Sequence, residues 1–203
     1  MIKEQQNRWN AWHWSYLGNP YNMHEALLAD SQVNLPVKNF LSGLLGKNGN
    51  YLLDIGSSPL SFTYIPKGQK VVSLDWAYLA LNGKEKVLAN ALNLPFPSSS
   101  FPAVLSKQVY QYIDHPDIFL DEMVRVLKPG GLFILIDGEF LRLLEGRNVR
   151  TDNLVRELKL KPNELFEKLR SRGIEDLGFQ RLFTLKTSFS EVALTAVYGK
   201  KAG

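Results

Sequence analysis

The stretch EMVRVLKPGGLFILI (residues 122–136) decides the fold. Its first part continues a helix that Asp114-His115-Pro116-Asp117 opens, because proline suits a first helical turn and acids there favour the helix dipole. Lys128-Pro129-Gly130-Gly131 ends that helix at about Leu127, and the apolar residues 132–136 form a predicted buried strand. A helix that leads directly into a buried strand is half of a β–α–β unit.

The same alternation of strands and helices extends in both directions. A second helix precedes the first strand at 36–45, and Pro162 opens a last helix that Gly173 closes. Alternating units imply a mostly parallel sheet with helices on both faces, whereas the short link between the last two strands requires an antiparallel pair. The seven predicted strands are residues 51–55, 70–74, 86–89, 103–106, 132–136, 179–187 and 190–198.

Composition narrows the possible chemistry. The chain has 203 residues, which suits one domain, and no cysteine, which excludes disulfides, thiolate metal sites and cysteine nucleophiles. Its three histidines (His13, His24 and His115) lack metal-ligand spacing, so we expect no metal. No apolar run approaches the ~20 residues of a membrane helix, and the N-terminus lacks a signal-peptide pattern. We therefore expect a cytoplasmic protein without a membrane partner.

Two acids follow neighbouring predicted strands. Asp54 lies in LLDIGSSP (52–59) and Asp75 ends VVSLD (71–75), and an acid in the second position can accept hydrogen bonds from both ribose hydroxyls of a nucleoside cofactor. NAD would fit Asp75 equally well. Pro59 removes a main-chain donor that a pyrophosphate needs, however, and S-adenosylmethionine carries no phosphate.

Two further segments complete a pattern: NALNLPFP (90–97) and RVLKPGG (125–131). With the LDIG loop and the acid at 75, they resemble class I S-adenosylmethionine-dependent methyltransferases of the type 11 group, in order and spacing over about residues 50–137. The resemblance implies a Rossmann-like α/β methyltransferase fold and S-adenosylmethionine as cofactor. The chain departs from the family in its loop, usually G-x-G-x-G, where only Gly56 remains, and at Asn90, usually an acid.

The resemblance also implies roles for matching residues. The methionine half of the cofactor would be lined by Asp54, Gly56, Ser57 and Ser58; the ribose would be held by Asp75; the adenine would lie against Trp76 and be bordered by Asn90, Ala91 and Leu92; and the transferred methyl would lie near Ser106, Lys107 and Gln108. No catalytic residue is assigned. The candidates for a catalytic role are His115 and Tyr110. His115 is a candidate base with helix capping as its alternative role. Tyr110 and Tyr112 are also candidate substrate contacts, with Tyr112 alternatively in the core.

Aromatic residues crowd the first 30 positions, which hold three of the four tryptophans. Trp9, Trp12 and Tyr16 share one helical face, which favours packing against the core over covering a ligand. Trp14 and Tyr21 lie off that face and are the better lid candidates. We expect one domain comprising an N-terminal helical cap (1–46), a cofactor-binding core (50–137), a cap or insert (138–161) and a closing helix and hairpin (162–203).

The whole net charge of +4 lies between Arg142 and Arg172, where nine Lys/Arg face five Asp/Glu. Arg142 and Arg147 in the cap could favour an acidic acceptor, although a solvated helix face is the more ordinary interpretation. The predicted function is transfer of a methyl group to a small molecule by in-line substitution. The alternatives are a catalytically silent S-adenosylmethionine-binding or regulatory protein, and an RNA methyltransferase. The acceptor and the oligomeric state stay open.

Overall fold

The computed structural model describes residues 20–46, 51–58, 61–77, 85–143, 160–186 and 190–203. The chain divides into two compact units, residues 1–95 and 96–203. Each unit has its own strands and helices, and each is described by itself.

The first unit contains three parallel strands in the order β3-β2-β1: β1 (Tyr51–Ile55), β2 (Lys70–Asp75) and β3 (Glu85–Leu88). Leu52, Leu53 and Ile55 of β1 are fully buried. Consecutive buried residues are typical of a parallel strand that is covered on both faces. The sequence prediction of these three strands is confirmed, with bounds that differ by at most one residue.

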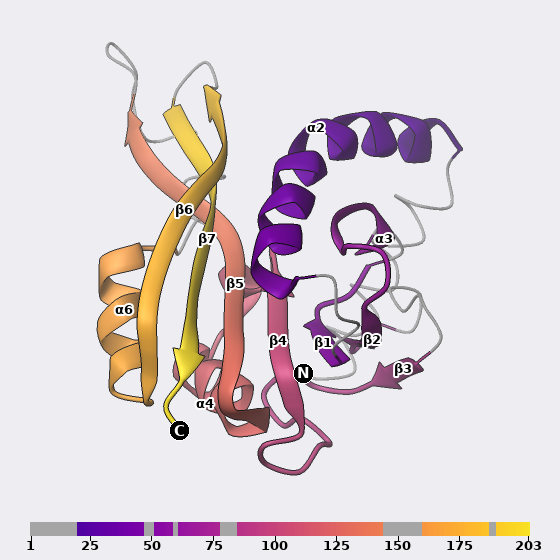
Figure 1. Cartoon of the computed structure of the whole chain (residues 1–203). Coiled ribbons are helices and arrows are strands. Elements are labelled where there is room, and N and C mark those ends of the chain that lie inside the picture. Colours follow the sequence, from indigo (N-terminus) through magenta and orange to yellow (C-terminus); the bar gives the residue numbers. More distant parts are fainter. Residues whose placement is uncertain (1–19, 47–50, 59–60, 78–84, 144–159, 187–189) are drawn as a thin grey trace. The chain divides into compact units, whose positions relative to one another are not determined.

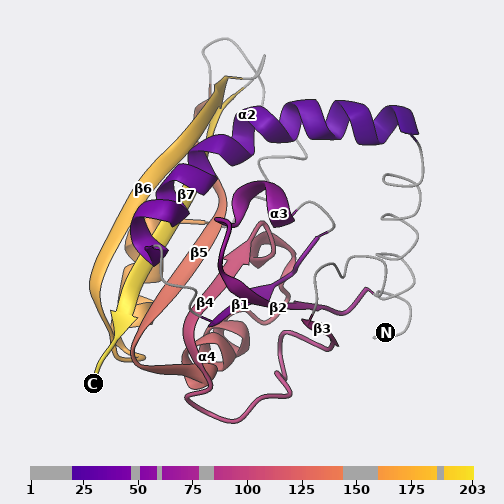
Figure 2. The ribbon, with the colours of Figure 1, turned by 45° about the vertical axis from the view of Figure 1, so that its right-hand side comes forward.

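Two helices accompany these strands, α2 (Pro20–Leu45) and α3 (Ser61–Tyr64), and Figure 2 shows α2 passing over α3. The predicted helix at 36–45 starts too late, because α2 begins at Pro20 and contains Pro36. A proline in a first turn costs no hydrogen bond, while one inside a helix bends it, and α2 is bent along its length (Figure 1). The short α3 ends two residues before Pro66, which cannot continue a helix.

The second unit contains a mixed sheet in the order β4-β5-β7-β6 (Figure 1). Strands β4 and β5 are parallel, and β7 is antiparallel to both β5 and β6, which confirms the predicted closing hairpin. Its helices are α4, α6 and the short 3-10 helix η2. The bounds are β4 (Phe101–Lys107), η2 (Tyr110–Tyr112), α4 (Pro116–Val126), β5 (Leu127–Leu143), α6 (Pro162–Arg170), β6 (Ile174–Lys186) and β7 (Ser190–Lys201).

Strand β5 is longer than the predicted 132–136, because residues 138–143, expected in the cap, continue it. Their pairing with β7 runs from Gly138 opposite Leu194 to Leu143 opposite Ser190. The partner strand thus supplies the hydrogen bonds that extend β5, which a local apolar pattern cannot reveal.

The two glycines near the start of this strand have steric roles. Gly130 adopts a φ of +70°, and a Cβ at Gly131 would lie 2.8 Å from the Lys128 carbonyl oxygen. Only glycine fits this close turn without strain. The KPGG motif therefore shapes the first residues of β5, directly after α4 ends at Val126, where the sequence predicts the helix to stop.

Helices α4 and α6 are joined by ion pairs. Lys168 of α6 and Arg172, two residues after its end, bind Asp117 of α4, and Arg172 also binds Asp121. Beneath them α4 buries Phe119, Leu120 and Met123, among other residues, and α6 buries Leu165 and Leu169. These contacts give the second unit a helical layer over its sheet.

Candidate functional site

The carboxyl ends of β1 and β2 carry two acids. Asp54 is fully buried, and its backbone lies opposite Ser73, two residues before Asp75. Burial raises the pKa of Asp75 to about 7, and the nearby Asp54 adds to this; the main-chain N–H groups of Ala77 and Trp76 act in the opposite direction. The Ala77 N–H donates to Asp75 Oδ1 at 2.7 Å. Two carboxyl groups therefore share one edge of the first unit, as the sequence predicted.

The loop after β1 crosses the end of β2. The N–H groups of Gly56 and Ser57 both donate to the Leu74 carbonyl oxygen, at 2.8 and 3.0 Å. Gly56 has a φ of +76°, which residues with a side chain rarely adopt. The one retained glycine of the family loop thus stands where the backbone needs it.

Three hydroxyl side chains lie buried behind this loop: Ser57, Ser61 and Tyr64, called here the hydroxyl cluster. Ser61 Oγ lies 2.7 Å from Tyr64 Oη and 3.4 Å from Ser57 Oγ. The Ser58 N–H also donates to Ser61 Oγ, at 3.0 Å. Sequence reasoning included Ser57 and Ser58 but missed Ser61 and Tyr64, because nothing in their local pattern marks them.

The segment after β3 adjoins Asp75 through the main chain, since the Ala89 N–H donates to the Asp75 carbonyl oxygen at 3.0 Å. Asn90 Oδ1 accepts the Leu92 N–H at 2.9 Å and so closes a local turn. A carbonyl oxygen has two lone pairs, so Asn90 retains the capacity to accept from an adenine amino group. Asn90, Ala91 and Leu92 are all partly exposed.

In the second unit the candidate residues after β4 are held by β5. The Gln108 N–H donates to the Ile136 carbonyl oxygen at 2.7 Å, and Lys107 Nζ donates to Gln108 Oε1 at 2.7 Å. Gln108 has a φ of +56°, a conformation that in residues other than glycine tends to mark functional sites. Ser106 Oγ is buried without a hydrogen-bond partner among the described residues.

Asp137 is a further buried acid that the sequence reasoning missed. It accepts the Gly138 N–H at 2.7 Å and the Gln111 N–H at 3.2 Å, and so holds η2 against β5. Burial raises its pKa to about 6, with these main-chain donors opposing the rise. The available signal was the one used for Asp54 and Asp75: an acid directly after an apolar run.

The two candidate bases differ in exposure. Tyr110 is buried beside Phe119, at 6.4 Å between ring centroids, and burial raises the pKa of its phenol. His115 is exposed at the start of α4 and makes no side-chain capping hydrogen bond. Tyr112, for which a place in the core was an alternative, is 47% exposed.

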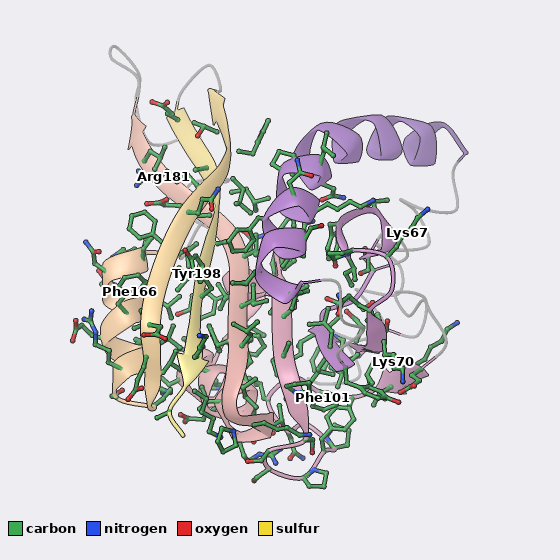
Figure 3. The ribbon with its side chains drawn as sticks, in the orientation of Figure 1. Lys67, Lys70, Phe101, Phe166, Arg181 and Tyr198 are labelled. Carbon is green, nitrogen blue, oxygen red and sulfur yellow. The ribbon has the colours of Figure 1, made fainter. Side chains whose placement is uncertain are left out.

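An ion pair between the buried Glu139 and the half-exposed Arg181 lies farther along β5, within the segment expected as cap. Glu139 accepts hydrogen bonds from Arg181 and Thr195, at 2.7 to 2.9 Å (Arg181 is labelled in Figure 3). Burial alone would raise the pKa of Glu139, but these donors outweigh burial and lower it. The pair joins three neighbouring strands, so we interpret it as structural.

Several expected residues fall where little is described. Trp14 and Arg147 lie outside the described residues, Tyr21 lies in α2 and Arg142 in β5. Within the described part of the chain, no group of three potential metal ligands occurs, and no helix is long and apolar enough to cross a membrane.

Comparison with known proteins finds similarity to methyltransferases over the segment that contains most of these candidate residues. The model of a family described as "Methyltransferase domain" matches residues 53–135. The phthiotriol/phenolphthiotriol dimycocerosates methyltransferase of Mycobacterium tuberculosis is 36% identical over 109 residues, which are 53% of this chain and 40% of that protein. The demethylmenaquinone methyltransferase of Renibacterium salmoninarum is 32% identical over 119 residues, 54% of this chain and 50% of that protein.

The chain thus spans half or less of the length of these relatives. Among solved structures, phosphoethanolamine N-methyltransferase 2 of Haemonchus contortus, in complex with phosphomonomethylethanolamine and S-adenosylhomocysteine, has a TM-score of 0.64 at 15% identity, over 84% of this chain and 52% of that one. This likeness shows the Rossmann-like α/β methyltransferase fold. By its matched segment and its fold, the chain is similar to the class I S-adenosylmethionine-dependent methyltransferases.

Proposed function

We propose that the chain binds S-adenosylmethionine and transfers its methyl group to a small-molecule acceptor. The observation that carries the proposal is Asp75, a partly buried carboxyl group at a strand end, beside Asp54 and a loop that turns on Gly56. S-adenosylmethionine offers ribose hydroxyls, an ammonium group and a sulfonium. The two carboxyl groups can accept hydrogen bonds from the hydroxyls and attract the positive groups. The loop that turns on Gly56 adjoins them.

In this proposal each part of the first unit has one task. Asp75 accepts from both ribose hydroxyls, while Asp54 faces the positive methionine half with Gly56, Ser57 and Ser58. Trp76 lies against the adenine, and Asn90, Ala91 and Leu92 border it. The support is the family match over residues 53–135, together with the strand-end positions of the acids.

S-adenosylmethionine supplies a methyl group on a sulfonium, which a nucleophile takes in one displacement while the sulfur keeps the bonding electron pair. The chain's residues have to orient the acceptor behind that methyl, and orientation alone can supply much of the rate. In our proposal Ser106, Lys107 and Gln108 border the reacting atoms, and Asp137 holds the adjoining turn. Where the acceptor must lose a proton, His115 is the more accessible candidate base, since Tyr110 is buried.

For the acceptor, the names of the relatives support an apolar small molecule of lipid or quinone type. An acidic acceptor is the second possibility, and it depends on Arg142 and Arg147. We also propose that Trp14 and Tyr21 cover the site, and that the protein works in the cytoplasm.

The test is titration calorimetry with S-adenosylhomocysteine on the wild type and on Asp75→Ala, with circular dichroism to confirm folding. Each lost charge-assisted hydrogen bond costs about 1.5–3 kcal/mol, and water replaces part of it, so we expect about 2–4 kcal/mol, or roughly 30-fold to 1,000-fold weaker binding. Binding within twofold of the wild type would contradict the role of Asp75.

Methyl transfer is tested separately with radiolabelled S-adenosylmethionine and a panel of demethylated quinones and lipid alcohols. Transfer to a member of the panel supports the enzyme. A wild type that binds the cofactor but methylates nothing in a cell extract would favour the silent binding protein instead.

A further inference from the structure

The loop between β1 and α3 lacks the glycines that usually shape it. Positions 58 and 60 carry serine and leucine where the family has glycine, and only Gly56 is kept. Glycine lets a ligand approach the main chain closely but leaves the unbound loop conformationally free. A loop with side chains at these positions is less free but cannot adopt every shape open to glycine, so the contacts that select its shape matter for the ligand.

The hydroxyl cluster provides such contacts. Ser61 is 5% exposed, and Ser57 and Tyr64 are 1% and 3% exposed. Ser61 Oγ accepts the main-chain N–H of Ser58 at 3.0 Å, and the Ser61 N–H donates back to the Ser58 carbonyl oxygen at 3.0 Å. Both hydrogen-bonding groups of the Ser58 main chain are thus held by a single residue.

The hydroxyl of Tyr64 helps to orient the hydroxyl of Ser61. A hydroxyl group has one hydrogen to donate and two lone pairs. Ser61 Oγ uses one lone pair for Ser58, and its contacts with Tyr64 Oη at 2.7 Å and Ser57 Oγ at 3.4 Å can fill its other lone pair and its hydrogen. Ser61 is therefore saturated, and buried groups arranged in this way are costly to disturb.

Building on the proposed function, we infer that Ser61 is a positioning residue for the methionine half of S-adenosylmethionine. Its hydroxyl, oriented by Tyr64, holds Ser57 and Ser58 in the shape that receives that half. Ser61 and Tyr64 are themselves buried and act through the loop. Side-chain hydroxyls thus replace glycines as the means by which this loop is shaped.

Two ligands separate this role from a general effect on the fold. S-adenosylhomocysteine carries the whole methionine half, and 5′-methylthioadenosine has the same adenosine and sulfur but no amino acid. Removing one buried hydroxyl that holds a main-chain donor is expected to weaken S-adenosylhomocysteine binding by about tenfold in Ser61→Ala. Binding of 5′-methylthioadenosine should stay within about twofold of the wild type, whereas Asp75→Ala should weaken both ligands.

Three variants complete the calorimetry. Ser61→Thr keeps the hydroxyl and should bind S-adenosylhomocysteine nearly as the wild type does. Tyr64→Phe removes only the orienting group and should weaken it by about threefold. Thr63→Val is the matched control, because the Thr63 hydroxyl lies on the same helix but accepts from Asn34 Nδ2 at 2.7 Å. It should leave both affinities unchanged.

The outcomes separate this inference from the function on which it rests. A folded wild type that binds no S-adenosylhomocysteine overturns the proposed function, and the inference with it. A wild type that binds, with a folded Ser61→Ala that binds equally well, overturns the inference alone, as does an equal loss for both ligands. If Ser61→Ala does not fold, Tyr64→Phe decides: S-adenosylhomocysteine affinity unchanged from the wild type overturns the inference.

Discussion

At the residue scale, the cofactor site that we propose includes the carboxyl group of Asp75. Burial raises the pKa of Asp75 to about 7, from an ordinary 3.8. The unfolded chain loses this proton at lower pH than the folded chain does. The Asp75 contribution to stability therefore falls as pH rises from about 4 to about 7 and is constant above that range. A ligand that donates hydrogen bonds to the Asp75 carboxylate should stabilise its ionised form and so lower its pKa.

We therefore expect S-adenosylhomocysteine binding to strengthen as pH rises toward 7 and then to level off. Below the pKa of Asp75 the change approaches about tenfold per pH unit, because binding must displace a proton. Calorimetry between about pH 5.5 and pH 8 measures this slope. Asp75→Asn is the control, since its amide does not titrate and its profile should be flat. Parallel profiles for the wild type and Asp75→Asn would rule out Asp75 as the titrating acceptor.

At the element scale, the last strand stabilises the end of a helix. Lys201 Nζ of β7 donates to the carbonyl oxygens of Val124 and Leu127, both at 2.8 Å. The helix α4 ends at Val126, so the ammonium group satisfies carbonyls that the helix itself leaves without partners. Burial lowers the pKa of Lys201.

Replacing Lys201 by methionine keeps the aliphatic stem and removes the donors. We expect the free energy of unfolding, measured in urea, to fall by about 1–2 kcal/mol. Lys200→Met is the matched control, because Lys200 is exposed and its Nζ lies 3.8 Å from Asp176; its effect should stay below about 0.5 kcal/mol. Equal effects of the two substitutions would show that Lys201 does not cap α4.

At the scale of the whole molecule, the positive charge is partly neutralised. The chain has a formal charge of +4, all of it accounted for by residues 142–172. Within the described residues of that stretch, the bases in and beside α6 form ion pairs: Lys161 with Glu164, Lys168 with Asp117, Arg170 with Glu167, and Arg172 with Asp117 and Asp121. Charges paired in this way are poor ligands for a phosphate backbone.

We accordingly expect no saturable binding of single-stranded RNA near physiological salt. Fluorescence polarisation with a labelled RNA at about 50 and about 200 mM salt tests this, because phosphate contacts make affinity strongly salt-dependent. Strong, salt-sensitive binding that is lost when Arg147 and Arg150 are reversed to glutamate would instead support the RNA methyltransferase alternative.

The sequence by itself determined the parts of this protein that depend on local patterns. Apolar runs and turn residues located all seven strands, since a buried strand and its boundaries leave a local signal. Asp54 and Asp75 followed from the same logic, because the ends of adjacent parallel strands meet at one edge. The order and spacing of motifs over about residues 50–137 predicted the family whose model matches residues 53–135.

Tertiary structure alone decided the features that depend on contacts between residues far apart in the sequence. Strand β5 extends to Leu143 because β7 pairs with it, and α2 continues through Pro36, where a local rule predicts a break. The position of Asp137 after an apolar run is visible in the sequence, but its main-chain donor in η2, Gln111, is not. Ser61 and Tyr64 are ordinary residues of a short helix until folding places their hydroxyls 2.7 Å apart. Hydrogen bonds form between groups that are close in the folded chain, and the periodicity of the sequence does not show which groups these are.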